Sequence, residues 1–406
     1  MVKPSRFLSR QFKIIICFAL GLLLWISTLL IPSPNYSLNP STELRGVWLT
    51  NIDSDVLFKP KNLSNAIDTL SQLNFNTLYP TVWNWGYTLY PSQVAKRTIG
   101  IELDPAEGLQ KRDILKETIK QAHKKGMAVI PWFEFGFMAP ADSELAKRHP
   151  EWLTQRQDGT TIWWEGKVHQ RVWLNPLHPE VQQFITDLVV EIVSKYDVDG
   201  IQFDDHFGYP SELGYDPFTV NLYQQEHGGK LPPSNPKDTA WIQWRADKIT
   251  DYMAQLFRTI KETNPKVLVS VSPNPQKFSL EAFLLDWKTW EEKRIVDELV
   301  IQVYRHDNNS FNRELSQPEL QEAKENIPVG IGVLTGLKGR HVPMDRIKTQ
   351  VETTRKQGFA GVSFFFYESL WELAQELPKQ RQSALQALFS SPIQRPTVSE
   401  NRYGNL

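Results

Sequence analysis

The chain has 406 residues, with 45 Lys and Arg against 46 Asp and Glu, 41% apolar residues and a single cysteine. This composition excludes a disordered or low-complexity protein, and the charge balance argues against the broadly basic surface that nucleic-acid binding needs, so we expect no nucleic-acid partner. Because Cys17 lies in the N-terminal apolar run, the body has no disulfides and no cysteine zinc site, and its stability must come from a large core.

The first forty residues differ from the rest of the chain. Basic residues within positions 3–13 precede an uncharged apolar run of 18 residues, 14–31. This order is typical of a secretory signal or of an uncleaved N-terminal anchor, and the run is just long enough to span a membrane. We expect the body to be exported to the periplasm or the medium, either released or held at the inner membrane by residues 14–31.

Residues 41–389 alternate short β-rich segments with longer segments of helical spacing, which predicts a (β/α)8 TIM barrel. A doubly wound sheet is the alternative, but no glycine-rich phosphate loop follows the first strand. The predicted strands are 44–51, 77–83, 128–136, 200–207, 267–274, 298–305, 328–335 and 361–368. The predicted helices are 62–73, 112–125, 179–195, 239–262, 280–293, 317–326, 344–357 and 371–389.

Enlarged loops are predicted after strands two, three and four, at residues 84–111, 137–178 and 208–238. Each follows the C-terminal end of a strand, which is the face that carries the active site in this fold. Residues 390–406 contain two prolines and few apolar side chains, and we expect a loose C-terminal tail.

Aromatic side chains cluster after the second and third strands. Trp83 and Trp85 follow strand two, and Trp132 lies on strand three. Flat aromatic faces stack on the apolar faces of sugar rings, so tryptophans beside carboxylates suit a saccharide groove. About half of the tryptophans in these loops are expected to be packing residues.

Glu134 ends strand three between aromatic neighbours. Its surroundings reduce solvation, which raises the pKa of a carboxyl group and suits a general acid. The alternative is a buried ion pair with Arg45 or Arg171.

Strand four carries the strongest candidate. Alternate side chains of a barrel strand face the lumen, so Gln202, Asp204 and His206 point inward if Ile201 packs under the helices. Asp204 then lies at the catalytic end, where a carboxylate has few structural reasons to exist. Asp205 has the opposite parity, but it remains a second catalytic candidate because the strand can end there.

Later strands supply further polar groups. Asn274, Gln302 and Tyr304 are expected to line the lumen and to hold hydroxyl groups of a ligand. On strand eight, Tyr367 points inward by parity, and Glu368 could turn over the rim as a second candidate for the acid.

Several segments resemble the glycosyl hydrolase-like 10 family, once described as a domain of unknown function, and are nearest in character to its cyanobacterial-type members. The matching segments are Glu43-Leu44-Arg45-Gly46-Val47-Trp48-Leu49-Thr50, Asn74-Phe75-Asn76-Thr77, Asp199-Gly200-Ile201-Gln202-Phe203-Asp204-Asp205 and Gly361-Val362-Ser363-Phe364-Phe365. The resemblance covers residues 43 to 388 and implies a barrel glycosidase of bacterial envelopes or secretions. The segment on strand four, from Asp199 to Asp204, is also similar to the chitinase pattern, but His206 stands where that pattern has its acidic proton donor, so the acid must come from another strand.

The sequence thus predicts hydrolysis of a glycosidic bond by two carboxyl groups, with Asp204 as nucleophile or base, Glu134 as first choice of acid and Glu368 as second. Glycan strands of peptidoglycan are the first expected substrate of an exported protein, and no cofactor is expected. One alternative is a carbohydrate-binding barrel that cleaves nothing. Another is a metal-dependent hydrolase with Asp204, Asp205 and His206 as ligands, although one strand alone does not complete such a site.

Overall fold

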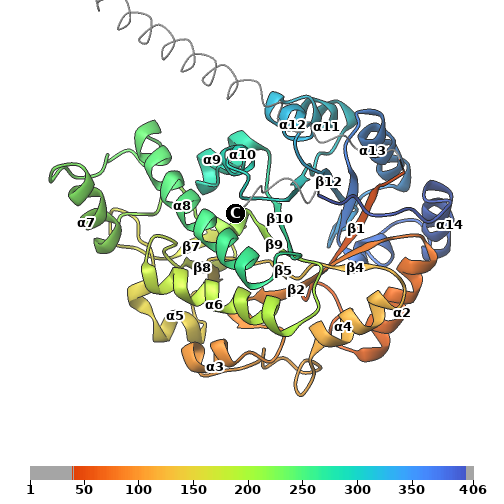
Figure 1. Cartoon of the computed structure of the whole chain (residues 1–406), viewed down its shortest axis with the longest axis horizontal. Helices are drawn as coiled ribbons and strands as arrows, with labels where there is room; N and C mark the ends of the chain where they lie inside the picture. Colours follow the sequence, from red (N-terminus) through yellow and green to blue (C-terminus); the bar gives the residue numbers. More distant parts are fainter. Residues whose placement is uncertain (1–38, 40, 399–406) are drawn as a thin grey trace, which may run out of the picture.

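The computed structural model describes residue 39 and residues 41–398 of the chain, and within them it confirms the predicted barrel. Eight parallel strand positions close into a ring, because β1 pairs with β2 on one side and with β15 on the other. The strands in order around the ring are β1 (Leu44–Leu49), β2 (Thr77–Asn84), β4 (Ala128–Val129) with β5 (Trp132–Phe133), β9 (Gly200–Asp204), β10 (Leu268–Ser272), β11 (Glu298–Gln302), β12 (Val329–Leu334) and β15 (Gly361–Phe365). In Figure 1 the first strand lies beside the last ones.

Helices surround this ring (Figure 1). Those that agree with the predicted segments are α2 (Pro60–Gln72), α4 (Ile114–His123), α6 (Pro179–Lys195), α8 (Thr239–Thr263) and α13 (Met344–Lys356). Additional short helices lie in the enlarged loops: α3 (Gln93–Ile99), α5 (Glu144–Arg148), η1 (Pro150–Trp152) and α7 (Pro217–Glu226).

Three predicted helices are wrong in their extent. The segment 280–293 is two helices, α9 (Gln276–Phe283) and α10 (Trp287–Glu292), because Leu284 takes a left-handed conformation and Asp286 caps the second helix. The segment 317–326 shortens to α12 (Pro318–Ala323) behind α11 (Asn308–Leu315). The segment 371–389 keeps only α14 (Pro378–Leu388), since Pro378 begins the helix, and the 3₁₀ turn η3 (Tyr367–Leu370) precedes the segment.

The predicted parity of strand four holds. Ile201 and Phe203 belong to the large apolar cluster between the strands and the helices. Gln202 instead faces the lumen, where it bonds the Trp48 indole and the Ser270 hydroxyl. A second apolar cluster fills the lumen itself, and its members are Leu44, Trp48, Tyr79, Ile130, Trp132, Val300 and Phe366. The barrel is therefore a packed core with a site only at its mouth.

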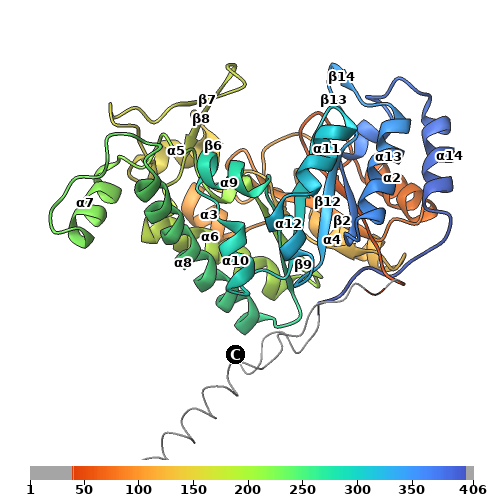
Figure 2. The ribbon, with the colours of Figure 1, turned by 90° about the horizontal axis from the view of Figure 1, so that it is seen from above.

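Two β-structures project from one end of the barrel (Figure 2). One is an antiparallel sheet of β6 (Met138–Pro140), β8 (His169–Trp173) and β7 (Trp163–Glu165), all from the enlarged third loop. The other is the hairpin of β13 (Gly336–Leu337) and β14 (Arg340–His341). At the same end, the short strand β3 (Tyr87–Thr88) pairs antiparallel with the last residues of β2. These additions form the walls of the mouth.

The expectation of a loose C-terminal tail is wrong for residues 390–398. The tail runs along the end of the barrel opposite to the hairpins (Figure 2), and Gln394 bridges to Thr42. Arg395 forms an ion pair with Glu298, which is fully buried inside the barrel. A buried carboxylate needs a charged or hydrogen-bonding partner, and the tail brings one to it.

The N-terminal prediction lies outside the described residues. Among residue 39 and residues 41–398, no helix is both long enough and apolar enough to cross a membrane.

Candidate active site

A pocket of about 270 Å³ opens at the C-terminal ends of the barrel strands. Its walls come from the ends of β1, β5, β9, β10, β11 and β15 and from β7 of the third loop. Three of the carboxyl groups predicted from the sequence meet in it: Glu134, Asp204 and Asp205. The barrel thus brings together side chains that lie as much as seventy residues apart in the chain.

Glu134 follows β5 and is held by three neutral donors. The Thr50 hydroxyl donates to Oε2 at 2.8 Å, the Thr81 hydroxyl at 2.9 Å and the Asn84 amide at 3.0 Å. Because all three bonds reach Oε2, the other oxygen is left for the pocket that this residue lines. Burial raises the pKa of Glu134 to about 7, although the two threonine hydroxyls act in the opposite direction.

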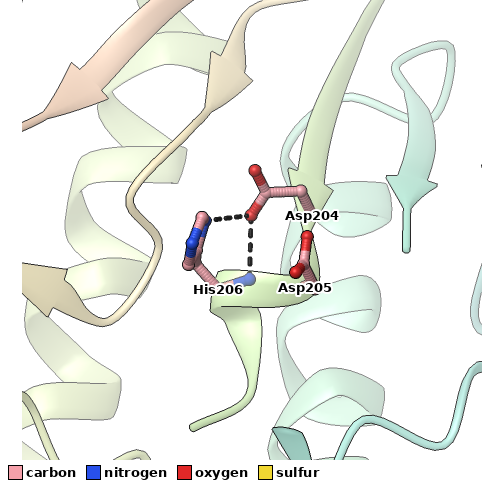
Figure 3. Close-up of side chains that lie close together, drawn as sticks. All are labelled: Asp204, Asp205 and His206. Carbon is pink, nitrogen blue, oxygen red and sulfur yellow. Dashed lines mark hydrogen bonds and ion pairs between the residues drawn. The ribbon is translucent and has the colours of Figure 1, made fainter. Parts of the chain in front are cut away.

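Asp204 ends β9 and pairs with a cation. Its Oδ1 accepts the backbone N–H of His206 at 2.9 Å and lies 3.2 Å from the imidazole Nδ1 (Figure 3). Its Oδ2 accepts the Trp132 indole N–H at 3.1 Å. Burial raises the pKa of Asp204 to about 6, and the positive charge of His206 limits that rise.

His206 is the positively charged residue of the site. Burial lowers its pKa, but the Asp204 carboxylate outweighs burial and raises the pKa to about 10. The Nδ1 atom also bonds the backbone carbonyl of Glu134 at 2.7 Å, and the ring lies between Phe135 and Trp173. His206 therefore stays protonated at neutral pH and favours the ionised form of Asp204.

Asp205 begins the 3₁₀ turn η2 (Asp205–Phe207) and faces the far wall of the pocket. Its Oδ2 accepts the Asn274 amide at 2.9 Å, and its Oδ1 accepts the Gln302 amide at 3.1 Å. Both donors were predicted as ligand-binding residues. Gln302 does line the pocket, whereas Asn274 lies behind Asp205 and positions it.

The floor of the pocket is aromatic. Trp48 and Trp132 lie 6.2 Å apart, and both contact the Phe365 ring at the base. Tyr304 stacks on Phe365 from the wall, with ring centroids 5.6 Å apart. Trp132, Tyr304 and His206 are thus placed where the sequence predicted ligand contacts. Gln202 lies beneath the floor, fully buried, and orients Trp48 instead.

Besides Asn274 and Gln202, four predicted residues do not line the pocket. Trp83 is fully buried and packs against Phe184 of α6, because an irregularity in the pairing of β2 with β5 turns it to the helix side. Trp85 is 45% exposed outside the pocket, where Arg171 lies over its ring. Tyr367, the first residue of η3, packs against Trp371.

Glu368 is the fourth of these residues, and its carboxyl group has a structural role. Its Oε1 accepts the backbone N–H groups of Asp55 and Val56 at 3.1 and 3.0 Å, and so holds the loop after β1. Burial raises its pKa to about 7, as it does for Glu134, but the carboxyl group is not in the pocket. The geometry leaves Glu134 as the candidate acid.

Some pocket residues were missed in the sequence. Thr50 and Thr81, which bond Glu134, follow the inward parity of β1 and β2, and that parity could have identified them. Asn84 has the opposite parity and reaches Glu134 beyond the irregularity that follows Thr81. Trp48 and Asp53 also line the pocket, although neither was predicted as a site residue. Glu165, on β7, also lines the pocket and forms an ion pair with Arg171 at 2.8 Å. No local sequence pattern predicts this position.

Asp204, Asp205 and His206 can each present one ligand atom within 4.8 Å of the others. Their atoms already serve other contacts: the Asp204 oxygens bond His206 and Trp132, and the Asp205 oxygens bond two amides. The arrangement fits an ion pair better than it fits the metal-ligand set considered from the sequence.

Gly136 controls the position of His206. It has φ +48°, and a Cβ there would lie 2.3 Å from the His206 carbonyl oxygen. We expect Gly136→Ala to lower the free energy of unfolding by about 2 kcal/mol or more. Neither the backbone strain at a positive φ nor the clash of the new Cβ with the His206 carbonyl oxygen can be relieved. Urea unfolding measures the change. Gly358→Ala is the control, because its φ is +73° but nothing lies within 4 Å; equal losses for both variants would contradict the role of the clash.

Comparisons with known proteins relate most of the chain to one family. Residues 43–354 match the model of the family described as Glycosyl hydrolase-like 10. Glycosyl hydrolase DigH of Escherichia coli (strain K12) is 26% identical over 308 residues, which are 65% of this chain and 66% of that protein. Glycosyl hydrolase YngK of Bacillus subtilis is 25% identical over 252 residues, 57% of this chain and 45% of that protein. The chain thus matches just under two thirds of the first relative and less than half of the second.

Solved structures share the fold at low sequence identity. The PgaB (BpsB) glycoside hydrolase domain from Bordetella bronchiseptica has a TM-score of 0.57 at 12% identity and covers 83% of this chain and 100% of that domain. The catalytic domain of beta-amylase from Paenibacillus polymyxa has a TM-score of 0.58 at 11% identity, with 86% and 98% covered. These likenesses show the (β/α)8 barrel fold.

Proposed function

The chain belongs to the glycosyl hydrolase-like 10 family, and from this premise we propose that it hydrolyses glycosidic bonds with Glu134 and Asp204 as the catalytic pair. One observation carries the proposal: two buried carboxyl groups share one pocket but have opposite surroundings. Glu134 has only neutral donors, whereas Asp204 has a cation, so the first tends to stay protonated and the second ionised.

These states suit the two roles that the reaction needs. Glu134 protonates the leaving glycosidic oxygen through the carboxyl oxygen that faces the pocket, and Asp204 attacks the anomeric carbon or activates a water. The Trp132 indole and the His206 imidazolium hold Asp204 in place. The aromatic floor of Trp48, Trp132 and Phe365 offers flat faces for the apolar side of a sugar ring.

The proposed substrate is a cell-envelope or extracellular polysaccharide, with peptidoglycan glycan strands as the first choice. The N-terminal order of basic residues and an apolar run supports export, so the barrel would work in the periplasm or outside the cell, anchored through residues 14–31 if that segment is retained. The polysaccharide is then the partner that an exported barrel of this family meets.

The test is the release of reducing ends by the full-length chain from purified peptidoglycan glycan strands, with and without their stem peptides. We expect release from at least one of the two preparations. Binding to the strands without any release would support a carbohydrate-binding barrel instead. Neither binding nor release would move the substrate away from the cell wall and toward another polysaccharide.

The pH profile of cleavage follows from the same pair. Since Asp204 must be ionised, kcat/KM should rise as the pH passes its pKa of about 6; since Glu134 must be protonated, it should fall as the pH passes about 7. We expect a narrow bell with its maximum between these values, measured by initial rates of reducing-end release. The residual activity of Glu134→Gln should lack the alkaline limb, and an unchanged limb in that variant would assign it to another group.

A further inference from the structure

A larger cavity lies beside the catalytic pocket, and none of the residues assigned above explains it. Its volume is about 730 Å³, and it is formed by β7, by the loop after η2, by the first turns of α8 and by α9. We call it the side groove. Its aromatic lining residues are Trp163, Phe278 and Phe283, and its polar ones include Ser211, Lys237, Gln243 and Glu281.

The side groove and the catalytic pocket both border β7. Trp163 lines the groove, and Glu165, two residues further on the same short strand, lines the catalytic pocket. Alternate residues of a strand point to the same face and lie about 7 Å apart, so one face of β7 roofs both cavities. The groove therefore lies next to the catalytic pocket along this strand.

A row of aromatic rings forms the wall between the two cavities. Trp173 lies 5.7 Å from the ring of His206 in the catalytic pocket and 6.0 Å from the ring of Phe283 in the groove. Phe278 continues the row 5.9 Å beyond Phe283, and Trp163 meets Trp173 edge-on at 6.0 Å. Trp173 itself is fully buried, so this row is the packed wall between the two cavities, and Phe278 and Phe283 are the rings of the row that line the groove.

The groove is rigidly built. The backbone N–H of Tyr209 donates to the carbonyl of Phe283, and that of Ser211 donates to the carbonyl of Ala282, so the loop after η2 is fastened to α9. Gly208 permits this contact, because a Cβ there would lie 1.9 Å from the Phe283 carbonyl oxygen. Phe278 is nevertheless 52% exposed at the edge of the groove. A preformed groove with an exposed ring and polar residues around it is typical of a ligand site.

We propose that the side groove binds further sugar units of the same polysaccharide chain whose bond is cleaved in the catalytic pocket, with Trp163 and Phe278 as stacking residues. The proposal rests on the proposed function and adds that the protein recognises a segment of several sugar units. Aromatic faces hold the apolar sides of the rings, and Gln243, Lys237 and Glu281 lie where hydroxyl and other polar groups of the sugars would need partners.

The experiment measures binding of glycan fragments of increasing length, prepared from peptidoglycan strands without stem peptides, to the full-length chain carrying Asp204→Asn. We expect this parent variant to have lost cleavage, so the fragments stay intact during the binding measurement. We expect the affinity of the parent to increase with fragment length. Adding Trp163→Ala or Phe278→Ala should weaken the binding of long fragments by roughly 10-fold each, a typical effect of removing an aromatic anchor, and should leave the shortest fragments unchanged.

Trp164→Ala is the matched control. Trp164 is the neighbour of Trp163 on β7, points to the opposite face and is 51% exposed. Its removal should leave binding at every length as in the parent. Thermal unfolding of each variant, compared with the parent, separates a loss of stacking from a loss of folding. Phe278→Ala is the safer of the two groove variants, because the exposed Phe278 ring contributes little to the core.

The outcomes separate this proposal from the proposed function. Cleavage of strands by the wild type, together with unchanged length dependence in both groove variants, would overturn the side groove and leave the function in place. Length-dependent binding that both variants lose, without any cleavage by the wild type, would support the groove and overturn the catalytic proposal. Absence of binding by the parent at every length would overturn a saccharide occupant of the groove.

Discussion

Exchange of Asp204 for Asn is expected to lower the rate of glycan cleavage by about 10³-fold or more, and Glu134→Gln by about 10²- to 10⁴-fold. Asparagine keeps an oxygen that can accept the backbone N–H of His206, but it can neither attack the anomeric carbon nor take a proton from water. Glutamine keeps an oxygen for the Thr50 and Thr81 hydroxyls, but it has no proton to give to the leaving group. Initial rates of reducing-end release measure both effects.

Glu368→Gln is the matched control for Glu134→Gln. Burial raises the pKa of both carboxyl groups to about 7, and both were candidate acids in the sequence, but only Glu134 lines the pocket. We expect the control variant to retain most of the wild-type rate, since glutamine can still accept the N–H groups of Asp55 and Val56. A loss in Glu368→Gln as large as that in Glu134→Gln would overturn the assignment of the acid.

Arg395→Ala is expected to reduce the free energy of unfolding by about 3–5 kcal/mol. The substitution leaves Glu298 inside the barrel without its cation, and the hydroxyls of Tyr79 and Ser270, at 3.1 and 2.9 Å from Oε1, remain as its neutral donors. Equilibrium unfolding in urea measures the loss. Adding Glu298→Gln to Arg395→Ala should recover part of it, because the uncompensated charge is removed.

The control for this prediction is Lys59→Ala. Lys59 and Asp55 also form an ion pair, at 3.4 Å, but their side chains are 67% and 72% exposed, so we expect a loss below about 1 kcal/mol. Equal, small losses in Lys59→Ala and Arg395→Ala would show that the tail does not fasten the barrel through this pair.

Parity along a strand predicted much of the site because it depends on local backbone geometry alone. It placed Gln202 and Asp204 in the lumen and Phe203 under the helices, as the structure has them. The same reasoning failed for Trp83, because the irregular pairing of β2 with β5 changes which face the later residues of β2 present. Parity also stops at the end of a strand, so it could not show that Glu368 turns toward the loop after β1.

The sequence by itself determined the barrel, its order of strands and helices, and the strand ends at which carboxyl groups gather, because hydrophobic periodicity and turn residues act over short distances. Only the tertiary structure decided which carboxyl groups share a pocket and what surrounds each of them. The proximity of Glu134 to Thr50, and that of Glu298 to Arg395, depends on contacts across the closed ring. Such contacts set burial and charge pairing, and therefore the pKa values from which acid and base are assigned.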